Sequence, residues 1–123
     1  MNPETQKRNE EAYVNHLKLL AATGKLIRLS ELDMGLADAK GNTVHTADVT
    51  AEQHRLMAGY YKFIVEKYLE IIPPAQQYGI TNWGVTDSPA GSFWRTDEPI
   101  GLWDVNYNRK PAYAGFADGL AGK

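Results

Sequence analysis

The chain has 123 residues, of which 43% are hydrophobic, and its formal net charge at pH 7 is -2. No apolar run approaches the roughly 20 residues of a membrane-spanning helix, and the near-neutral charge provides neither a basic face for nucleic acid nor a polybasic membrane anchor. Because cysteine is absent, disulfide bonds and thiolate metal sites are excluded. The sequence therefore predicts a soluble chain of at most one domain over residues 1–123 that binds neither nucleic acid nor membranes.

The first predicted elements are a helix and a strand. Residues 2–9 are polar and are expected to be frayed, and apolar residues at helical spacing predict a helix over 10–23 that Gly24 ends. An alternating apolar run predicts a strand over 26–32, and a polar loop is expected over 34–48. A helix, a glycine and a strand in this order are typical of α/β proteins.

Two carboxylates stand at the end of this predicted strand. If the side chains alternate, Glu31 and Asp33 lie on the same face as Ile27 and Leu29. One interpretation is an ordinary acidic strand end or helix cap. The other is a catalytic group, because α/β enzymes carry catalytic residues where strands give way to loops.

A long helix follows. Thr50 and Gln53 form a capping box that predicts its start, and Pro73 and Pro74 prevent its continuation beyond about Ile72. Its expected core residues are apolar or aromatic: Leu56, Tyr60, Phe63, Ile64, Leu69 and Ile71. Three tyrosines on this helix are interpreted as packing residues: Tyr60, Tyr61 and Tyr68.

A second strand is predicted over 80–86, opened by Gly79. The loop over 88–101 that follows carries Phe93, Trp94 and Arg95, a heavy aromatic load for a loop without a core of its own. Loops of this composition usually bind a ligand.

A closing helix is expected over 111–120, with Tyr113, Phe116 and Leu120 facing inward. The order of elements predicts an α/β fold with parallel strands joined by a right-handed crossover. Two parallel strands leave two unpaired edges, and parallel sheets are found almost only with several strands and both faces covered. The chain is not expected to close such a structure alone.

The remaining chemistry-bearing residues are aromatic residues and histidines. All three tryptophans fall between Trp83 and Trp103, and clustered indoles beside carboxylates suit sugars, because the ring stacks on their C–H faces. A tryptophan-rich corner of the core is the alternative. His16, His45 and His54 lack metal-ligand spacing, so no metal and no cofactor are predicted. His16 and His54 are expected on helix surfaces.

Three motifs occur in order: R-L-S-E-L-D-M at 28–34, W-G-V-T-D-S at 83–88 followed by W-R, and G-L-W-D-V-N-Y-N-R-K-P-A-Y-A-G at 101–115. They resemble the seventh strand, the eighth strand with its loop, and the approach to the last helix of the glycoside hydrolase family 10 endo-1,4-β-xylanases. The resemblance covers residues 10–120. It implies a partial (β/α)₈ TIM barrel, namely helix 6, strand 7, helix 7, strand 8 and helix 8 at the C-terminal end of the catalytic domain.

The resemblance also implies roles for individual residues in a retaining hydrolysis of xylan. Glu31 would be the nucleophile that attacks the anomeric carbon. Trp83 would form the floor or wall of the subsite for the reacting sugar, and Trp94 with Arg95 would cover that sugar from the loop. Asp33 would support the site, and a purely structural role for it is an equal alternative.

A retaining enzyme needs a second carboxyl group about 5–5.5 Å from the nucleophile. The family's acid/base glutamate lies in a W-x-V-x-N-E type motif that does not occur here, and a complete barrel takes about 250 residues. The isolated chain is therefore expected to be inactive. Asp87, Asp97, Glu98 and Asp104 lie at the same end of the barrel as Glu31, but the sequence singles out none of them as the acid.

Two further hypotheses concern binding and assembly. A non-catalytic carbohydrate-binding module is the alternative function, although such modules are usually β-sandwiches. Exposed strand edges also predict that the isolated chain forms a homo-oligomer or aggregates. The expected partners are xylan or xylo-oligosaccharides, the remainder of the catalytic barrel and further copies of the chain. The resemblance implies an extracellular or periplasmic location.

Overall fold

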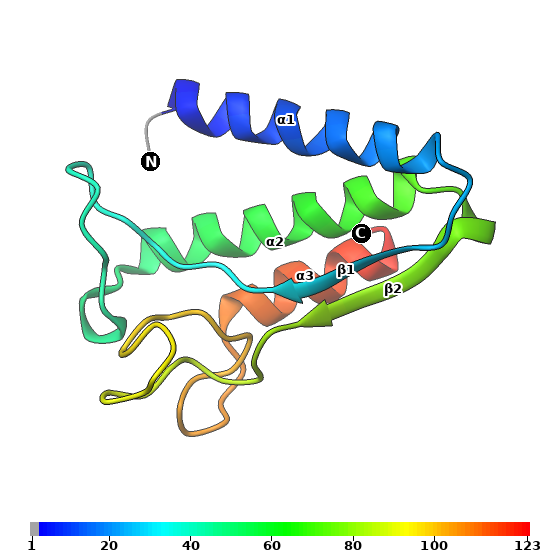
Figure 1. Ribbon diagram of the computed structural model, residues 1–123. Helices are drawn as coiled ribbons and strands as arrows, with labels where there is room; N and C mark the ends of the chain where they lie inside the picture. The colour runs from blue at the N-terminus through cyan, green and yellow to red at the C-terminus, as the bar shows by residue number, and fades with distance from the viewer. Residues whose placement is uncertain (1–2) are drawn as a thin grey trace.

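The computed structural model describes residues 3–123. Its elements are α1 (Pro3–Ala21), β1 (Ile27–Leu32), α2 (Ala51–Ile71), β2 (Gln77–Asn82) and α3 (Pro111–Ala121), with short 3₁₀ helices at Thr46–Asp48 and Pro74–Gln76. The predicted order of helices and strands is confirmed. Helix α2 lies between α1 and α3, and both strands point toward the same cluster of loops (Figure 1). Within the described residues, no helix is long and apolar enough to cross a membrane.

Strands β1 and β2 pair in parallel, as predicted. The second strand runs over Gln77–Asn82, however, and the prediction of 80–86 was wrong at both ends. Gly79 lies inside the strand with a φ of +139°, and does not open it. Strand β2 ends at Asn82, so that Trp83 lies just beyond its carboxyl end.

Helix α1 begins earlier than predicted. Residues 3–9 are helical, so the expectation of a frayed segment was wrong for them, and residue 2 lies outside the described residues. A proline at the first position suits a helix start, because its missing N–H group needs no partner there. Side chains four residues apart add support: Gln6 donates to Glu10 at 2.9 Å, and Lys7 lies 3.9 Å from Glu11.

The capping box of α2 is confirmed. The backbone N–H of Thr50 donates to Gln53 Oε1 at 2.9 Å, and the backbone N–H of Gln53 donates to Thr50 Oγ1 at 3.1 Å. The core face of this helix differs from the prediction, because Leu56 is 54% exposed. The buried residues follow helical spacing on a neighbouring face: Met57, Tyr61, Ile64, Val65 and Tyr68.

The buried tyrosines of α2 also join it to the segments that it covers. Tyr68 Oη donates to the carbonyl of Ile27 on β1 at 2.7 Å, and Tyr61 Oη donates to the carbonyl of Ile100 at 3.2 Å. The interpretation of these tyrosines as packing residues is confirmed. Their hydroxyls connect to α2 both β1 and the loop over 88–101, called the aromatic loop below because it carries Phe93 and Trp94.

Helix α3 packs closely on α2 through glycines. A Cβ atom at Gly115 would overlap the carbonyl of Ala58, and one at Gly119 would lie 2.9 Å from Val65 Cβ. The packing seam therefore follows small residues, and Leu120, which was expected to face inward, is exposed.

The core consists of two clusters that α2 connects. One contains Leu17, Ile27, Tyr68 and Ile72, and the other contains Met57, Tyr61, Leu102 and Ala112. Both lie on the helix-covered face of the strands. Side chains that alternate with the core residues are exposed, including Arg28, Ser30, Tyr78 and Thr81. The described sheet thus has one covered face and one open face.

Candidate active site

Glu31 lies in an irregular stretch of β1. Its φ is +60°, a left-handed conformation that is uncommon for a residue with a side chain. The pairing with β2 shifts between Leu29 and Leu32, as in a β-bulge, where one extra residue re-aims its neighbours. The predicted common face of Ile27, Leu29, Glu31 and Asp33 is therefore wrong. Glu31 is exposed, and Leu32 turns toward the second core cluster.

Trp83 lies beside this bulge. Its backbone N–H donates to the carbonyl of Leu32 at 3.0 Å, which places it next to the residue that follows Glu31. Its ring meets that of Trp94 edge to face, with centroids 6.3 Å apart and an interplanar angle of 72°. Both indoles remain about half exposed, at 48% for Trp83 and 50% for Trp94, so these two tryptophans do not form a corner of the core.

Asp33 connects the end of β1 with the aromatic loop. Its Oδ2 accepts a hydrogen bond from Trp94 Nε1 at 3.1 Å, and its Oδ1 accepts one from Arg95 Nη1 at 2.8 Å. These residues are separated by about sixty positions in sequence, so the contacts are tertiary. The structure thus brings Asp33, Trp94 and Arg95 together, and Trp83 joins them through the ring of Trp94.

Glu98 completes the surroundings of Arg95. Its Oε2 accepts from Arg95 Nε at 3.0 Å and from Arg95 Nη2 at 2.8 Å. Burial by itself would lower the pKa of Arg95, but the hydrogen bond to Glu98 and the charges of Asp33 and Glu98 outweigh it and raise that pKa. The guanidinium therefore stays charged.

A buried ion pair anchors the aromatic loop at its two ends. Lys110 Nζ donates to Asp87 Oδ1 at 2.5 Å and to the carbonyls of Pro99 and Gly101 at 2.9 and 3.0 Å. The same carboxylate oxygen accepts from the backbone N–H of Gly101 at 2.9 Å. All three ammonium donors are thus satisfied inside the protein.

His54 lies near this ion pair. Its Nδ1 is buried and has no hydrogen-bond partner, so its expected position on the helix surface was wrong. Burial, and then the positive charge of Lys110, lowers the pKa of His54. The neutral imidazole is therefore the form that the fold favours.

The four loop carboxylates that lie beyond β2 are engaged in other contacts. Asp87 pairs with Lys110, Glu98 pairs with Arg95, and Asp97 lies 3.8 Å from His45 Nδ1. The side-chain amide of Asn108 donates to Asp104 and lowers the pKa of that carboxyl group. Among the described residues, no group of three or more His, Asp or Glu side chains is arranged to hold a metal ion.

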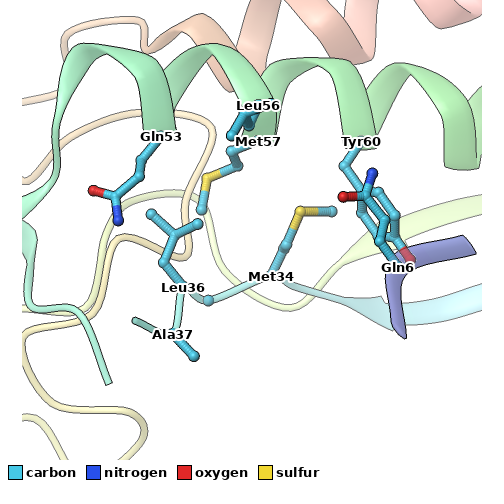
Figure 2. A pocket seen from close by; sticks show the side chains of 9 residues that line it. Gln6, Met34, Leu36, Ala37, Gln53, Leu56, Met57 and Tyr60 are labelled. Carbon is cyan, nitrogen blue, oxygen red and sulfur yellow. The ribbon is translucent and has the colours of Figure 1, made fainter. Parts of the chain in front are cut away.

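Two hollows lie near the end of β1. An open one, bounded by α1, α2 and β1, is lined by Tyr13, Glu31, Asp33 and Ile64 among others. An apolar one lies between α1, α2 and the loop after β1, and Figure 2 shows Met34, Leu36 and Met57 pointing into it. Only the first contains predicted site residues.

Sequence reasoning missed several residues that organise the site. The pairing of Asp87 with Lys110 carries no local signal, because these two residues become neighbours only in the folded chain. Glu98 pairs with Arg95 only three residues away, but the sequence analysis considered Glu98 only as a possible acid. Gly35 falls within the polar loop predicted over 34–48, yet a Cβ atom there would overlap Arg95 Nη2.

The geometry is that of an α/β protein with an exposed carboxylate at a strand end beside paired indoles. The family model for glycosyl hydrolase family 10 matches residues 2–119. The chain belongs to glycosyl hydrolase family 10.

Relatives agree with this assignment. The chain is 35% identical to endo-beta-1,4-xylanase Xyn10C of Cellvibrio japonicus, over 86% of this chain and 19% of that protein. It is 29% identical to endo-1,4-beta-xylanase 2 of Aureobasidium pullulans, over 85% of this chain and 26% of that protein.

Solved structures show the same relation. A thermostable mutant of the xylanase Xyn10A from Cellvibrio japonicus superposes with a TM-score of 0.75 at 28% identity, covering 89% of this chain and 35% of that one. Xylanase10C from the same organism, solved as a mutant in complex with xylopentaose, gives the same TM-score and identity. The match covers 89% of this chain and 24% of that one. The chain thus spans about a quarter to a third of the length of these solved chains, which are (β/α)₈ barrel xylanases.

Proposed function

We propose that this chain is the nucleophile-bearing part of a retaining endo-1,4-β-xylanase. The observation that carries the proposal is the placement of Glu31, which is exposed on a left-handed bulge of β1, beside the paired indoles of Trp83 and Trp94. Strained backbone of this kind concentrates at functional sites. The family assignment supports hydrolysis of the β-1,4 bonds of xylan.

The aromatic pair is proposed to bind the reacting sugar. An edge-to-face pair offers two differently directed ring faces, which suits a sugar that is contacted from below and from one side. Trp83 would form the floor or wall and Trp94 the cover. The complex of the related Xylanase10C with xylopentaose supports a xylo-oligosaccharide as the ligand.

In the proposed reaction, a carboxylate oxygen of Glu31 forms a bond to the anomeric carbon while the bond from that carbon to the glycosidic oxygen breaks. An acid protonates the departing oxygen, and the resulting glycosyl ester is then hydrolysed by water that the same group activates as a base. Asp33 would support Glu31 by holding the end of β1 against the loop that carries Trp94 and Arg95.

The acid/base is proposed to lie outside this chain. Of the four loop carboxylates, Asp87 and Glu98 are ion-paired and Asp104 is held in its charged form, whereas an acid needs a raised pKa. We propose that the chain corresponds to helix 6, strand 7, helix 7, strand 8 and helix 8 of the barrel. The remaining strands would cover the open sheet face and supply the acid/base. An extracellular or periplasmic location, implied by the resemblance, is part of this proposal.

A carbohydrate-binding module without catalysis is the second candidate, because the exposed tryptophan pair alone would bind sugar. The fold does not favour it, since three helices and a two-stranded parallel sheet differ from the β-sandwich that such modules usually adopt.

Reducing ends released from xylan separate the two functions. We expect no release by the chain alone, and release after it is co-expressed with strands 1–6 of a family 10 xylanase. Persistent binding without release in the assembled protein would support the module and contradict the enzyme.

A further inference from the structure

Four residues fasten the aromatic loop to the end of β1: Asp33, Gly35, Arg95 and Glu98. We call them the Arg95 clamp. Three N–H groups of the guanidinium are used by two carboxylates, one on the strand side at 2.8 Å and one on the loop at 2.8 and 3.0 Å. Only 28% of the Arg95 side chain is exposed. The planar fork is thus directed at protein carboxylates, the geometry for which arginine is best suited.

Gly35 provides an independent indication that this arrangement is specific. A Cβ atom at this position would overlap Arg95 Nη2 and would lie 2.6 Å from Glu98 Oε2. The salt bridge therefore packs directly against the backbone just beyond Asp33. The glycine serves close approach here, because its own φ is not in the left-handed region.

The loop backbone around the clamp is also unusual. Arg95 and Asp97 have φ values of +47° and +56°, which residues with side chains adopt only when the surrounding contacts impose them. The hydrogen bonds of Arg95 to Asp33 and Glu98 are contacts of that kind. Losing them would leave the loop free to relax to a commoner conformation.

Trp94 is held by the same carboxylate as Arg95. Asp33 accepts from the indole N–H of Trp94 at 3.1 Å, and the hydroxyls of Ser88 and Ser92 donate to the Trp94 carbonyl at 2.6 and 3.2 Å. Because one oxygen of Asp33 serves the indole and the other serves the guanidinium, a shift of either partner moves the carboxylate that holds the other.

We propose that Arg95 is a positioning residue: it acts through Asp33 and Gly35 to hold the indole of Trp94 edge-on to Trp83 over the sugar site, and does not itself bind the sugar. This proposal rests on the proposed function for its consequence in catalysis. Arg95 was expected to cover the sugar, but in this proposal it only positions Trp94. Gly35 contributes because it leaves room for the guanidinium of Arg95.

The indole N–H signal of Trp94, measured in the chain assembled with strands 1–6 of a family 10 xylanase, tests the clamp without any activity. In a ¹H–¹⁵N spectrum, with Trp94→Phe assigning the signal, Arg95→Gln and Gly35→Ala should both move the Trp94 indole resonance, whereas Arg95→Lys should move it less. Arg109→Gln is the matched control, since Arg109 stacks on Tyr113 at 4.7 Å on another part of the surface. An unmoved Trp94 signal in Arg95→Gln, with the helical circular dichroism preserved, would overturn the proposal.

Kinetics of the assembled barrel on xylopentaose separate positioning from direct binding. Arg95→Gln should raise KM up to roughly tenfold, the effect of losing the contact of one misplaced aromatic ring with the sugar, and should add nothing further in a Trp94→Ala background. If the double variant shows the product of the two single effects on KM, Arg95 contacts the sugar independently of Trp94, and the positioning role is refuted. If the assembled barrel fails to hydrolyse xylopentaose at all, the proposed function falls, while the indole measurement still decides the clamp.

Discussion

The buried pair of Lys110 and Asp87 provides a strong test of how the aromatic loop is held. Replacing Lys110 by methionine keeps an unbranched side chain one atom shorter and removes the charge and its three donors. It leaves the Asp87 carboxylate, the Pro99 carbonyl and the Gly101 carbonyl without the partner that they share. The side chains of Lys110 and Asp87 are 5% and 2% exposed, so water cannot take over.

The cost follows from these contacts. Removing one partner of a buried ion pair typically costs about 3–5 kcal/mol, because the remaining charge is uncompensated. The whole free energy of unfolding of a domain is only about 5–15 kcal/mol. We therefore expect Lys110→Met to lose a large part of the stability of the chain and to release the loop that carries Trp94.

Urea unfolding followed by far-UV circular dichroism measures this loss. Lys62→Met is a matched control, because Lys62 lies 3.6 Å from Glu66 with both side chains more than a third exposed, and surface pairs contribute about 0–1 kcal/mol. Adding Asp87→Asn to Lys110→Met should recover part of the loss by removing the stranded charge. A Lys110→Met variant as stable as Lys62→Met would refute the reasoning.

Three further predictions concern packing, pH and assembly. Gly115→Ala should destabilise the chain by about 1–3 kcal/mol in the same urea titration, because the new Cβ would overlap the backbone of α2, which cannot move aside. Gly59→Ala is the control: its Cβ would meet open space, so it should stabilise the chain by about 0.5–1 kcal/mol. The pKa of His54 is lowered in the folded chain, so the unfolded chain binds the proton more readily. The contribution of neutral His54 to the free energy of unfolding should therefore be fully present above the unfolded pKa of about 6.5, and should fall as the pH drops below that value. His54→Gln should flatten the melting temperature between pH 7 and 5, and an unchanged slope would contradict this. Light scattering should find the isolated chain oligomeric or aggregated, and a monomer with a cooperative melt would argue against exposed strand edges.

Features of the fold that depend on local sequence were predictable. The capping box of Thr50 and Gln53 and the stop at Pro73 involve residues within one or two turns, and both are confirmed. The parallel pairing followed from the order of elements alone. The wrong boundary of β2 and the misplaced core face at Leu56 have another cause: which residues pair or become buried depends on neighbours that the local pattern does not contain.

The candidate site shows the same division. Glu31, Trp83 and Trp94 were predicted from the resemblance that the motifs carry, and Asp33 was expected to support the site; these roles stay predictions. The bulge that turns Glu31 away from the face of Leu29 exists only through pairing with β2, so alternation along one strand could not reveal it. The tertiary partner of Arg95 across the loop, Asp33, is likewise about sixty residues away in sequence.

The identity of the nucleophile is the central claim, and covalent trapping tests it most directly. The reagent is a 2-deoxy-2-fluoro xylobioside with an activated leaving group. This leaving group departs without an acid, and the fluorine slows hydrolysis of the glycosyl-enzyme that forms. In the protein assembled with strands 1–6 of a family 10 xylanase, peptide mass spectrometry should place one xylobiosyl adduct on Glu31, and Glu31→Gln should abolish it. An adduct on another carboxylate, or one that persists in Glu31→Gln, would contradict the assignment.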